Sequence, residues 1–191
     1  MNKRQFLAAA GAAAGAPLTA HAAMRTHGPA LLTITGAITR GNRGPLDPAL
    51  DQMMAKQKLG FTSAYTYDFA ALLALPAKTI RPTLEYDGKR HLLRGPLLTE
   101  VLAQTGVRRD GNIRAVLRAV DGYAAAVPLS QVNSHGYIVA THLDGQPMAL
   151  GGLGPLWAVY DADRVPEMAA RPLQERFGFC PWALYHIELQ A

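Results

Sequence analysis

YIVATHLDGQPMALGGLGPLWAVYD, residues 137–161, contains two strand-like runs separated by a turn and a glycine-rich loop. The first run, 137–143, carries β-branched and aromatic side chains and ends at Asp144-Gly145, a dipeptide that strongly favours a hairpin. The second run, 156–160, follows the loop LGGLGP. This part of the chain is therefore expected to consist of β-strands.

The same alternation of short strands and turns continues outward from this stretch. Three further Asp-Gly pairs, at 87–88, 110–111 and 121–122, fall at or near strand-like runs. Pro82 is expected to place its strand at a sheet edge or at a bulge, because proline has no N–H to donate. The expected strands are 31–36, 78–86, 89–94, 113–120, 123–127, 137–143, 156–160 and 183–189, and the expected helices are 48–58, 69–75 and 96–106.

The order of these elements predicts the fold class. Strands dominate, the few helices are short, and strands and helices do not alternate strictly. A doubly wound parallel sheet requires that alternation, so the pattern favours an α+β fold. No internal repeat and no linker follows residue 30, and the expected organisation is a flexible segment at 23–30 and one domain at 31–191.

The N-terminus has the composition of an export signal. Two cations, Lys3 and Arg4, precede an apolar Ala/Gly run that ends in the small-residue pattern Ala20-His21-Ala22. This arrangement predicts a signal peptide at 1–22, cleaved near Ala22, and a periplasmic mature protein. Residues 3–7, KRQFL, also resemble a weakened twin-arginine signal. No segment approaches the ~20 apolar residues that a membrane-spanning helix needs.

Charge and cysteine content exclude several classes of function. Removal of the signal peptide takes away two cations and lowers the net charge from +5 to about +3, which is too small to indicate nucleic-acid binding. The single Cys180 cannot form an internal disulfide or a thiolate zinc site. Walker, HExxH, GxSxG and paired CxxC motifs are absent, and the histidines do not fall at short metal-ligand spacings.

Three stretches in order, 86–107, 118–161 and 182–189, resemble the oxidoreductase molybdopterin-binding family, which has the sulfite-oxidase fold. The most specific parts are DG-PM followed by GPLW-VY, and the closing WALYHIEL. The resemblance implies a mixed, β-rich α+β domain that covers nearly all of 31–191. Catalytic members of the family bind molybdenum through a cysteine on the loop after an early strand, and the matching region TIRPTLEYDG at 79–88 contains none. Soft thiolate ligation is lost there.

The sequence thus resembles a cysteine-less branch of this family, some of whose members bind pterins in the periplasm and signal to a membrane protein that controls cyclic-di-GMP. The resemblance implies a pterin without molybdenum as the ligand, a membrane signalling partner and no catalysis. The alternatives are a molybdopterin-dependent oxidoreductase and an adaptor with an empty pocket. A basic residue common in the family is replaced by Leu153, which argues against a phosphate on the pterin, and the insert at 46–64 is expected to form a partner surface or lid.

The expected ligand-binding residues combine ring faces for stacking with polar groups for hydrogen bonds. Trp157 is favoured over Tyr160 because residues three apart on a strand point to opposite faces. Asp121 has a second interpretation, as part of its turn, and Tyr123 and Trp182 as core aromatics. Cys180 lies in a different part of the chain from the family's metal-binding cysteine and is expected to be a buried or semi-buried, inert thiol. The expected site comprises Glu85, Tyr86, Arg94, Asp121, Tyr123, Trp157 and Trp182.

Overall fold

The computed structural model describes residues 28–107 and 112–191. The predicted signal peptide at 1–22 and the turn expected at Asp110-Gly111 lie outside the described residues, as does most of the segment 23–30. Within the described part, no helix is long and apolar enough to cross a membrane.

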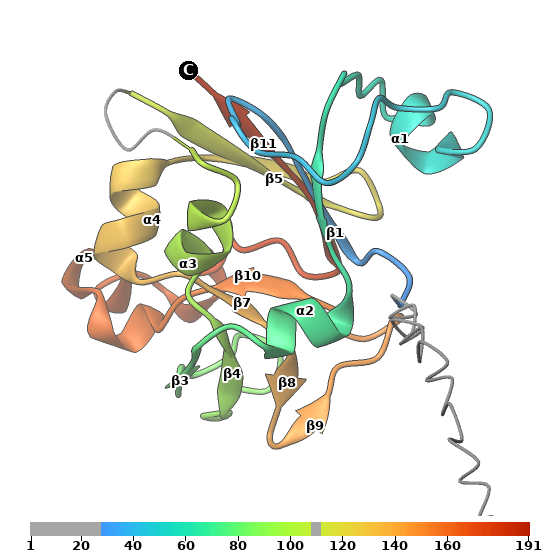
Figure 1. The fold of residues 1–191 in the computed structure, drawn as a ribbon. Coiled ribbons are helices and arrows are strands. Elements are labelled where there is room, and N and C mark those ends of the chain that lie inside the picture. Colours follow the sequence, from blue (N-terminus) through green and yellow to red (C-terminus); the bar gives the residue numbers. More distant parts are fainter. Residues whose placement is uncertain (1–27, 108–111) are drawn as a thin grey trace, which may run out of the picture.

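A five-stranded sheet joins the two ends of the described chain. Its strand order is β2-β1-β11-β5-β6, and β1 pairs parallel with β11 while the other neighbours are antiparallel. The first and last strands therefore lie side by side inside the sheet (Figure 1). The strands are β1 (Leu32–Gly36), β2 (Tyr65–Tyr67), β5 (Arg114–Ala119), β6 (Ala124–Pro128) and β11 (Leu184–Gln190).

The stretch 137–161 supplies strands to two smaller sheets. β7 (Ile138–Ala140) pairs antiparallel with β10 (Trp157–Val159). A four-stranded sheet, ordered β3-β4-β8-β9, contains β3 (Ala77–Ile80), β4 (Leu93–Pro96), β8 (His142–Leu143) and β9 (Gln146–Pro147). The β8–β9 turn has positive φ at both Asp144 (49°) and Gly145 (83°), the geometry that Asp-Gly favours. The predicted hairpin is confirmed.

Short helices cover the sheets between strands. α3 (Leu98–Ala103) and α4 (Leu129–His135) contact each other on one side, while α1 (Gln52–Lys56) projects from a corner of the molecule (Figure 1). α2 (Phe69–Leu73) begins at the predicted cap, where the Asp68 carboxylate accepts a hydrogen bond of 2.7 Å from the amide of Ala71. α5 (Pro166–Ala169) lies between two 3₁₀ turns, Ala162–Arg164 and Leu173–Glu175.

Several expected boundaries are wrong, and the reasons are local. The strand expected at 78–86 ends at Ile80, because the chain turns where Pro82 cannot donate to a ladder; β3 is nonetheless the edge strand that this proline predicted. The helix expected at 48–58 is restricted to α1, because the Asp47 carboxylate caps a separate turn by accepting from the amide of Ala49 at 2.8 Å. β2, α4 and α5 were not expected.

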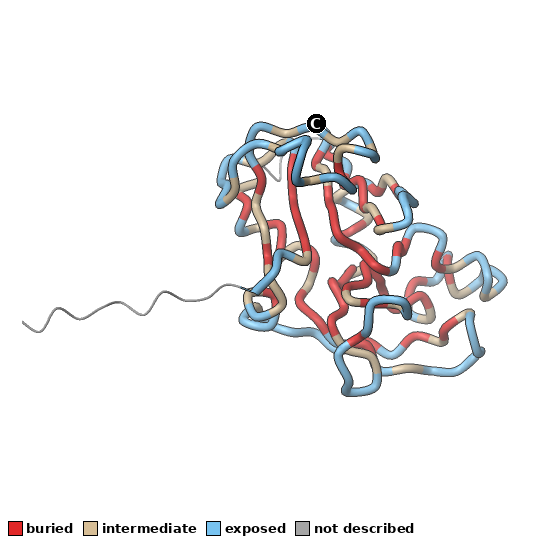
Figure 2. The backbone as a smooth tube through the Cα atoms, turned by 90° about the vertical axis from the view of Figure 1, so that its right-hand side faces the viewer, coloured by how far each residue is buried: buried red, intermediate tan, exposed pale blue. Residues whose placement is uncertain are grey.

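One apolar cluster unites the three sheets. Buried side chains from β1, β5, β7, β10 and β11 belong to the same core, and the buried segments run through the centre of the molecule (Figure 2). The described chain is therefore a single small domain with mixed, sheet-rich structure, as the α+β assignment predicted.

Candidate functional site

Five of the seven residues expected at the ligand site line one cavity of about 250 Å³. They are Glu85, Tyr86, Asp121, Tyr123 and Trp182. The rest of the lining is Ala119, Gln174, Phe177, Gly178, Cys180 and Pro181. Residues from three distant parts of the sequence thus meet at one place.

Three separate turns position these side chains. Residues 85–86 lie in the turn after β3, which is closed by a hydrogen bond of 2.8 Å from the amide of Leu84 to the carbonyl of Lys89. Residues 121–123 form the β5–β6 hairpin turn. Trp182 lies just before β11, and the pairing of β11 with β5 brings it next to that hairpin. Turns at the ends of a rigid sheet hold their side chains in defined positions, and binding residues are often found in such turns.

The aromatic rings at the cavity are unusually accessible. Tyr86 is 54% exposed, Tyr123 is 49% exposed and Trp182 is 38% exposed. The hydroxyl of Tyr123 donates a hydrogen bond to the carbonyl of Gly178, which holds the ring at the rim. Accessible rings held in place offer ready stacking surfaces for a flat ligand. The interpretation of Tyr123 and Trp182 as core aromatics is therefore wrong.

Two carboxylates lie among these rings. The Asp121 carboxylate accepts a hydrogen bond of 2.9 Å from the amide of Tyr123, so Asp121 both closes its turn and lines the cavity. Burial, with the nearby Glu85 carboxylate adding to it, raises the pKa of Tyr86 to about 12. The Tyr86 phenol is therefore protonated at neutral pH, and it can donate a hydrogen bond.

A second hollow, of about 740 Å³, adjoins the first. Tyr86 and Trp182 line both, and the second is completed by residues 150–153 of the glycine-rich loop together with Val120 and Ala183. Gly151 has a φ of +96°, which a side chain would make strained. The loop in 137–161 is thus next to the site, with Leu150 70% exposed at its tip.

Trp157 does not line the cavity, and its expected role is wrong. It is fully buried in β10, its indole N–H donates to the Cys180 carbonyl at 2.8 Å, and its ring centroid lies 6.4 Å from that of Tyr86. Tyr160, also buried, packs instead on Tyr137 at 4.8 Å. Trp157 therefore lies behind the cavity wall, and its indole N–H binds the backbone of Cys180, which lines the cavity.

Arg94 also lies away from the cavity. It is in the middle of the four-stranded sheet, where β4 pairs it with Thr79 of β3 and His142 of β8, and its side chain is exposed. Its place in the sequence, just before α3, gave no information on which side of the sheet its side chain would emerge. Arg94 is therefore not among the residues that line this cavity.

Cys180 lies at the site, which the sequence did not indicate. It is 3% exposed, lines the cavity beside Pro181, and burial raises the pKa of its thiol far above the usual range. The expectation of a buried thiol is confirmed. Its short distance in sequence from Trp182 was the available signal. Within residues 28–107 and 112–191, no group of three His, Cys, Asp or Glu side chains could hold a metal ion.

We expect the native protein to resist thiol alkylation. Because the Cys180 thiol is buried and protonated, iodoacetamide at pH 8 should modify it far more slowly than it modifies the same chain in denaturant, where the pKa returns to ~8.5. Mass spectrometry of timed samples measures the difference. Equal rates in the two conditions would show that the thiol is accessible in the fold.

Comparisons with known proteins support the fold alone. No family model and no curated protein matches the sequence. Among solved structures, the fold is similar to that of the sulfane dehydrogenase SoxCD from Paracoccus pantotrophus, with 13% identity and a TM-score of 0.55. The match covers 83% of this chain and 37% of the SoxCD chain, so this chain spans little more than a third of that neighbour.

Proposed function

We propose that this is a periplasmic, non-catalytic pterin-binding protein that signals ligand occupancy to a membrane protein controlling cyclic-di-GMP. The observation that carries the proposal is the convergence of three accessible aromatic rings and two carboxylates on one cavity. The predicted export signal and the resemblance to exported pterin-binding proteins supply the location and the partner. Neither the predicted location nor the proposed partner requires a bound metal.

The chemistry of the cavity suits a pterin. A pterin is a flat, bicyclic ring whose amino-pyrimidine edge carries N–H donors, and it needs ring faces to stack on and acceptors to bind. Tyr86, Tyr123 and Trp182 provide the faces, while Glu85 and Asp121 provide the acceptors. The volume of about 250 Å³ is slightly below the ~300–1,000 Å³ of sites for drug-sized ligands, which agrees with a smaller heterocycle.

The residues at this site do not fit a molybdenum centre. Glu85 and Tyr86 occupy the region where catalytic members of the resembled family have their cysteine, and a hard carboxylate is a poor substitute for a soft thiolate. Among the described residues that line the cavity, Cys180 alone offers a sulfur ligand, and the raised pKa of its thiol opposes the deprotonation that ligation requires. We therefore derive no metal-dependent step.

The alternative function is a molybdopterin-dependent oxidoreductase. One observation favours it: the fold is similar to that of the sulfane dehydrogenase SoxCD. Metal analysis of protein purified from a molybdate-supplied native host separates the two functions. Stoichiometric molybdenum would establish the alternative, whereas a bound pterin without molybdenum is the result that we expect.

A route from the ligand to the partner begins at the β5–β6 hairpin. Gln57, at the end of α1, donates to the carbonyl of Val120 at 3.2 Å and accepts from the hydroxyl of Tyr185 at 2.7 Å. The insert 46–64 is thus attached next to Asp121, and Leu50 on it is 82% exposed. A ligand that orders the hairpin would restrict the insert, which we propose as the surface that the membrane partner contacts.

We expect Glu85→Gln to weaken the binding of tetrahydropterin by roughly 10- to 100-fold, because hydrogen bonds to a charged group contribute about 1.5–3 kcal/mol. Isothermal titration at pH 7 under anaerobic conditions measures the affinity, with quenching of tryptophan fluorescence as a second readout, since Trp182 lines the cavity. Glu100→Gln, on α3, is the matched control and should bind like the unmodified protein. Unchanged affinity in Glu85→Gln, or no binding by the unmodified protein, would contradict the proposed site.

A further inference from the structure

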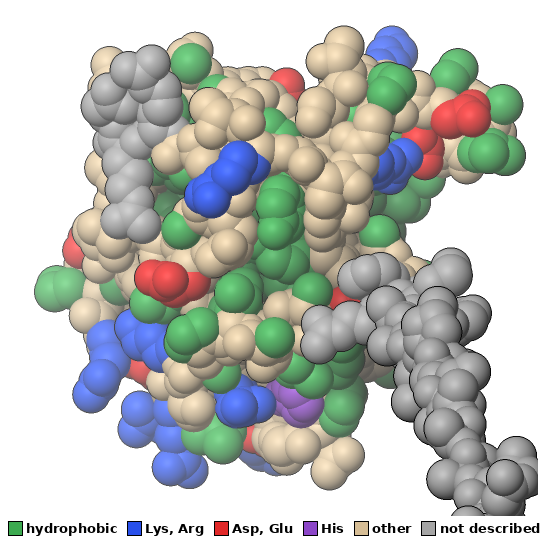
Figure 3. Space-filling model, in the orientation of Figure 1, with side chains coloured by type: hydrophobic (Ala, Val, Ile, Leu, Met, Phe, Trp, Pro, Cys, Tyr) green, Lys and Arg blue, Asp and Glu red, His purple; other side chains and the backbone are tan. Residues whose placement is uncertain are grey.

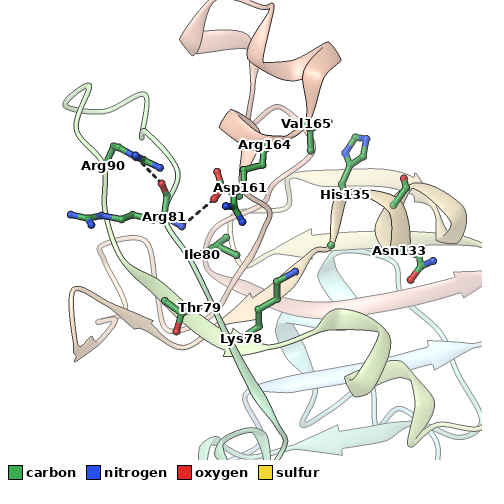
Figure 4. Close-up of a pocket in the computed structure, with 12 residues that line it drawn as sticks. Lys78, Thr79, Ile80, Arg81, Arg90, Asn133, His135, Asp161, Arg164 and Val165 are labelled. Atoms are coloured by element: carbon green, nitrogen blue, oxygen red, sulfur yellow. Dashed lines mark hydrogen bonds between the residues drawn. The ribbon is translucent and has the colours of Figure 1, made fainter.

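A second cavity, of about 470 Å³, lies on another part of the surface and is distinct from the pterin site in its lining (Figure 4). It is formed where β3, the C-terminal end of α4 and the turn after β10 meet. None of its lining residues belongs to the first cavity. Its lining is Lys78, Thr79, Ile80, Arg81, Arg90, Asn133, Ser134, His135, Gly136, Asp161, Arg164 and Val165.

Four cations line this cavity without a close ion pair to an acidic side chain of the described residues. Among the described residues, no ion pair within 4.0 Å involves Lys78, Arg81, Arg90 or Arg164, although other arginines of the chain are paired. Figure 3 shows Lys and Arg side chains gathered on the surface over the β3 region. Cations placed this close together repel one another, and an anion bound between them would remove that cost.

A buried carboxylate at the centre of the cavity is only half satisfied. Asp161 is 9% exposed, and one of its oxygens accepts a hydrogen bond of 3.3 Å from the amide of Arg81. Its other oxygen, Oδ1, is buried without a partner in the described structure. Figure 4 places this carboxylate between Arg81 and Arg164. An unsatisfied buried acceptor is unfavourable, so it marks a position that a donor from a ligand can fill.

His135 adds a second unsatisfied group at the edge of the cavity. Its side chain is 8% exposed and its Nε2 pairs with Glu167 at 3.0 Å, while its Nδ1 is buried without a partner in the described residues. Lys78 extends over Gly136, where a Cβ would lie 3.2 Å from the lysine Nζ, so the cation is close to the end of α4. Cations and unpaired buried atoms thus share one small space.

We propose that this cavity is a binding site for a small phosphate ester that also carries a hydroxyl or amino donor. The phosphate binds among Lys78, Arg90 and Arg164, because a dianion matches several unpaired cations and guanidinium groups bind phosphate oxygens in pairs. The donor binds Asp161 Oδ1. The volume of about 470 Å³ is in the ordinary range for small-molecule sites. The proposal is independent of pterin binding.

The test is a titration of the full mature chain with glycerol 3-phosphate, followed by ¹H–¹⁵N NMR. We expect shifts of the amide signals of Ile80, Gly136 and Val165, and a weaker affinity as ionic strength rises. Lys78→Gln combined with Arg164→Gln should lower the affinity at least roughly tenfold, since charge-assisted hydrogen bonds to the phosphate are lost. Lys56→Gln, an exposed change on α1, is the control for net charge.

Three further probes and one further variant decide the chemistry. Glycerate replaces phosphate by carboxylate, inorganic phosphate lacks the carbon-borne hydroxyl donors, and glycerol lacks the anion; all three should bind more weakly than glycerol 3-phosphate. Asp161→Asn should remove the preference for glycerol 3-phosphate over inorganic phosphate, because it weakens the acceptor. Glycerate binding equally well would overturn the phosphate assignment. No movement of the three amides with millimolar glycerol 3-phosphate, or equal shifts with glycerol, would overturn the site itself.

Discussion

Replacing Trp157 by Ala should lower the free energy of unfolding by about 3–5 kcal/mol, the usual cost of deleting a large buried aromatic side chain. Trp157 is fully buried, and its ring centroid lies 6.4 Å from that of Tyr86 and 6.1 Å from that of Phe177. Its indole N–H donates a hydrogen bond of 2.8 Å to the carbonyl of Cys180. Domains of this size have about 5–15 kcal/mol of stability in total, so the variant should unfold at a much lower denaturant concentration. Urea titration followed by circular dichroism measures this.

Two matched variants separate packing from hydrogen bonding at this position. Trp157→Phe keeps a ring but removes the donor to Cys180, and should cost less than Trp157→Ala. Trp182→Ala removes the other tryptophan, which is 38% exposed, and should cost about 1 kcal/mol or less while weakening pterin binding. Equal destabilisation by Trp157→Ala and Trp182→Ala would contradict the placement of Trp157 in the core.

Acidification should destabilise the protein through His186. Burial, reinforced by the nearby Arg118 guanidinium, lowers the pKa of His186 from 6.5 to about 4. Between those values the unfolded chain binds a proton on this ring that the folded protein does not bind, so the free energy of unfolding falls as the pH falls. The shift corresponds to roughly 3 kcal/mol, fully lost by about pH 4. Unfolding titrations at pH 7, 5.5 and 4.5 measure the loss.

Variants isolate this histidine from the other titrating groups. In the fold, His186 is 1% exposed, its Nε2 lies 2.9 Å from the Thr35 hydroxyl and its Nδ1 has no partner among the described residues. His186→Gln retains a polar group for Thr35, and its stability should depend less on pH between 7 and 4.5. An unchanged pH dependence in this variant would contradict the buried, neutral state of His186.

His91 is the control, because its pKa is shifted in the opposite direction. Hydrogen bonds first to Asp144 and then to Asp87 raise the pKa of His91. Its contribution to stability is therefore complete below pH 6.5 and is lost as the pH rises through the raised value. His91→Gln should change the pH dependence above 6.5 and leave the loss between 6.5 and 4 intact. The two histidines thus define separate pH ranges.

Local chemistry accounts for the parts of the fold that the sequence predicted. Asp-Gly pairs favour positive φ and tight turns whatever surrounds them, so the hairpins at 121–122 and 144–145 were correctly placed. Asp68 begins α2 for a similar reason, since its carboxylate reaches an amide three residues away. α4 and β2 were missed because their helical or extended state depends on contacts with segments far away in the sequence.

The ligand site was predictable in part. The resemblance to a known family pointed to Glu85, Tyr86, Asp121, Tyr123 and Trp182, and the structure brings these five residues together. Strand alternation placed Trp157 and Tyr160 on opposite faces, but both are buried and the rings of both lie near Phe177, because Tyr160 follows the end of β10. Nothing in the local pattern around Arg94 indicated on which side of its sheet the side chain emerges.

The sequence by itself determined most of the turns, the class of fold and most of the residues around the candidate ligand site, because these depend on backbone preferences within a few residues or on recognisable local patterns. Only the tertiary structure decided that Trp157 supports the site from behind, that Cys180 lies in its wall, and that unpaired cations surround Asp161. Those positions are set by the pairing of β11 with β1 and β5 and by the packing of β10 on β7, which join residues as much as about 150 positions apart. Such contacts arise from burying the whole core at once, and no short segment contains them.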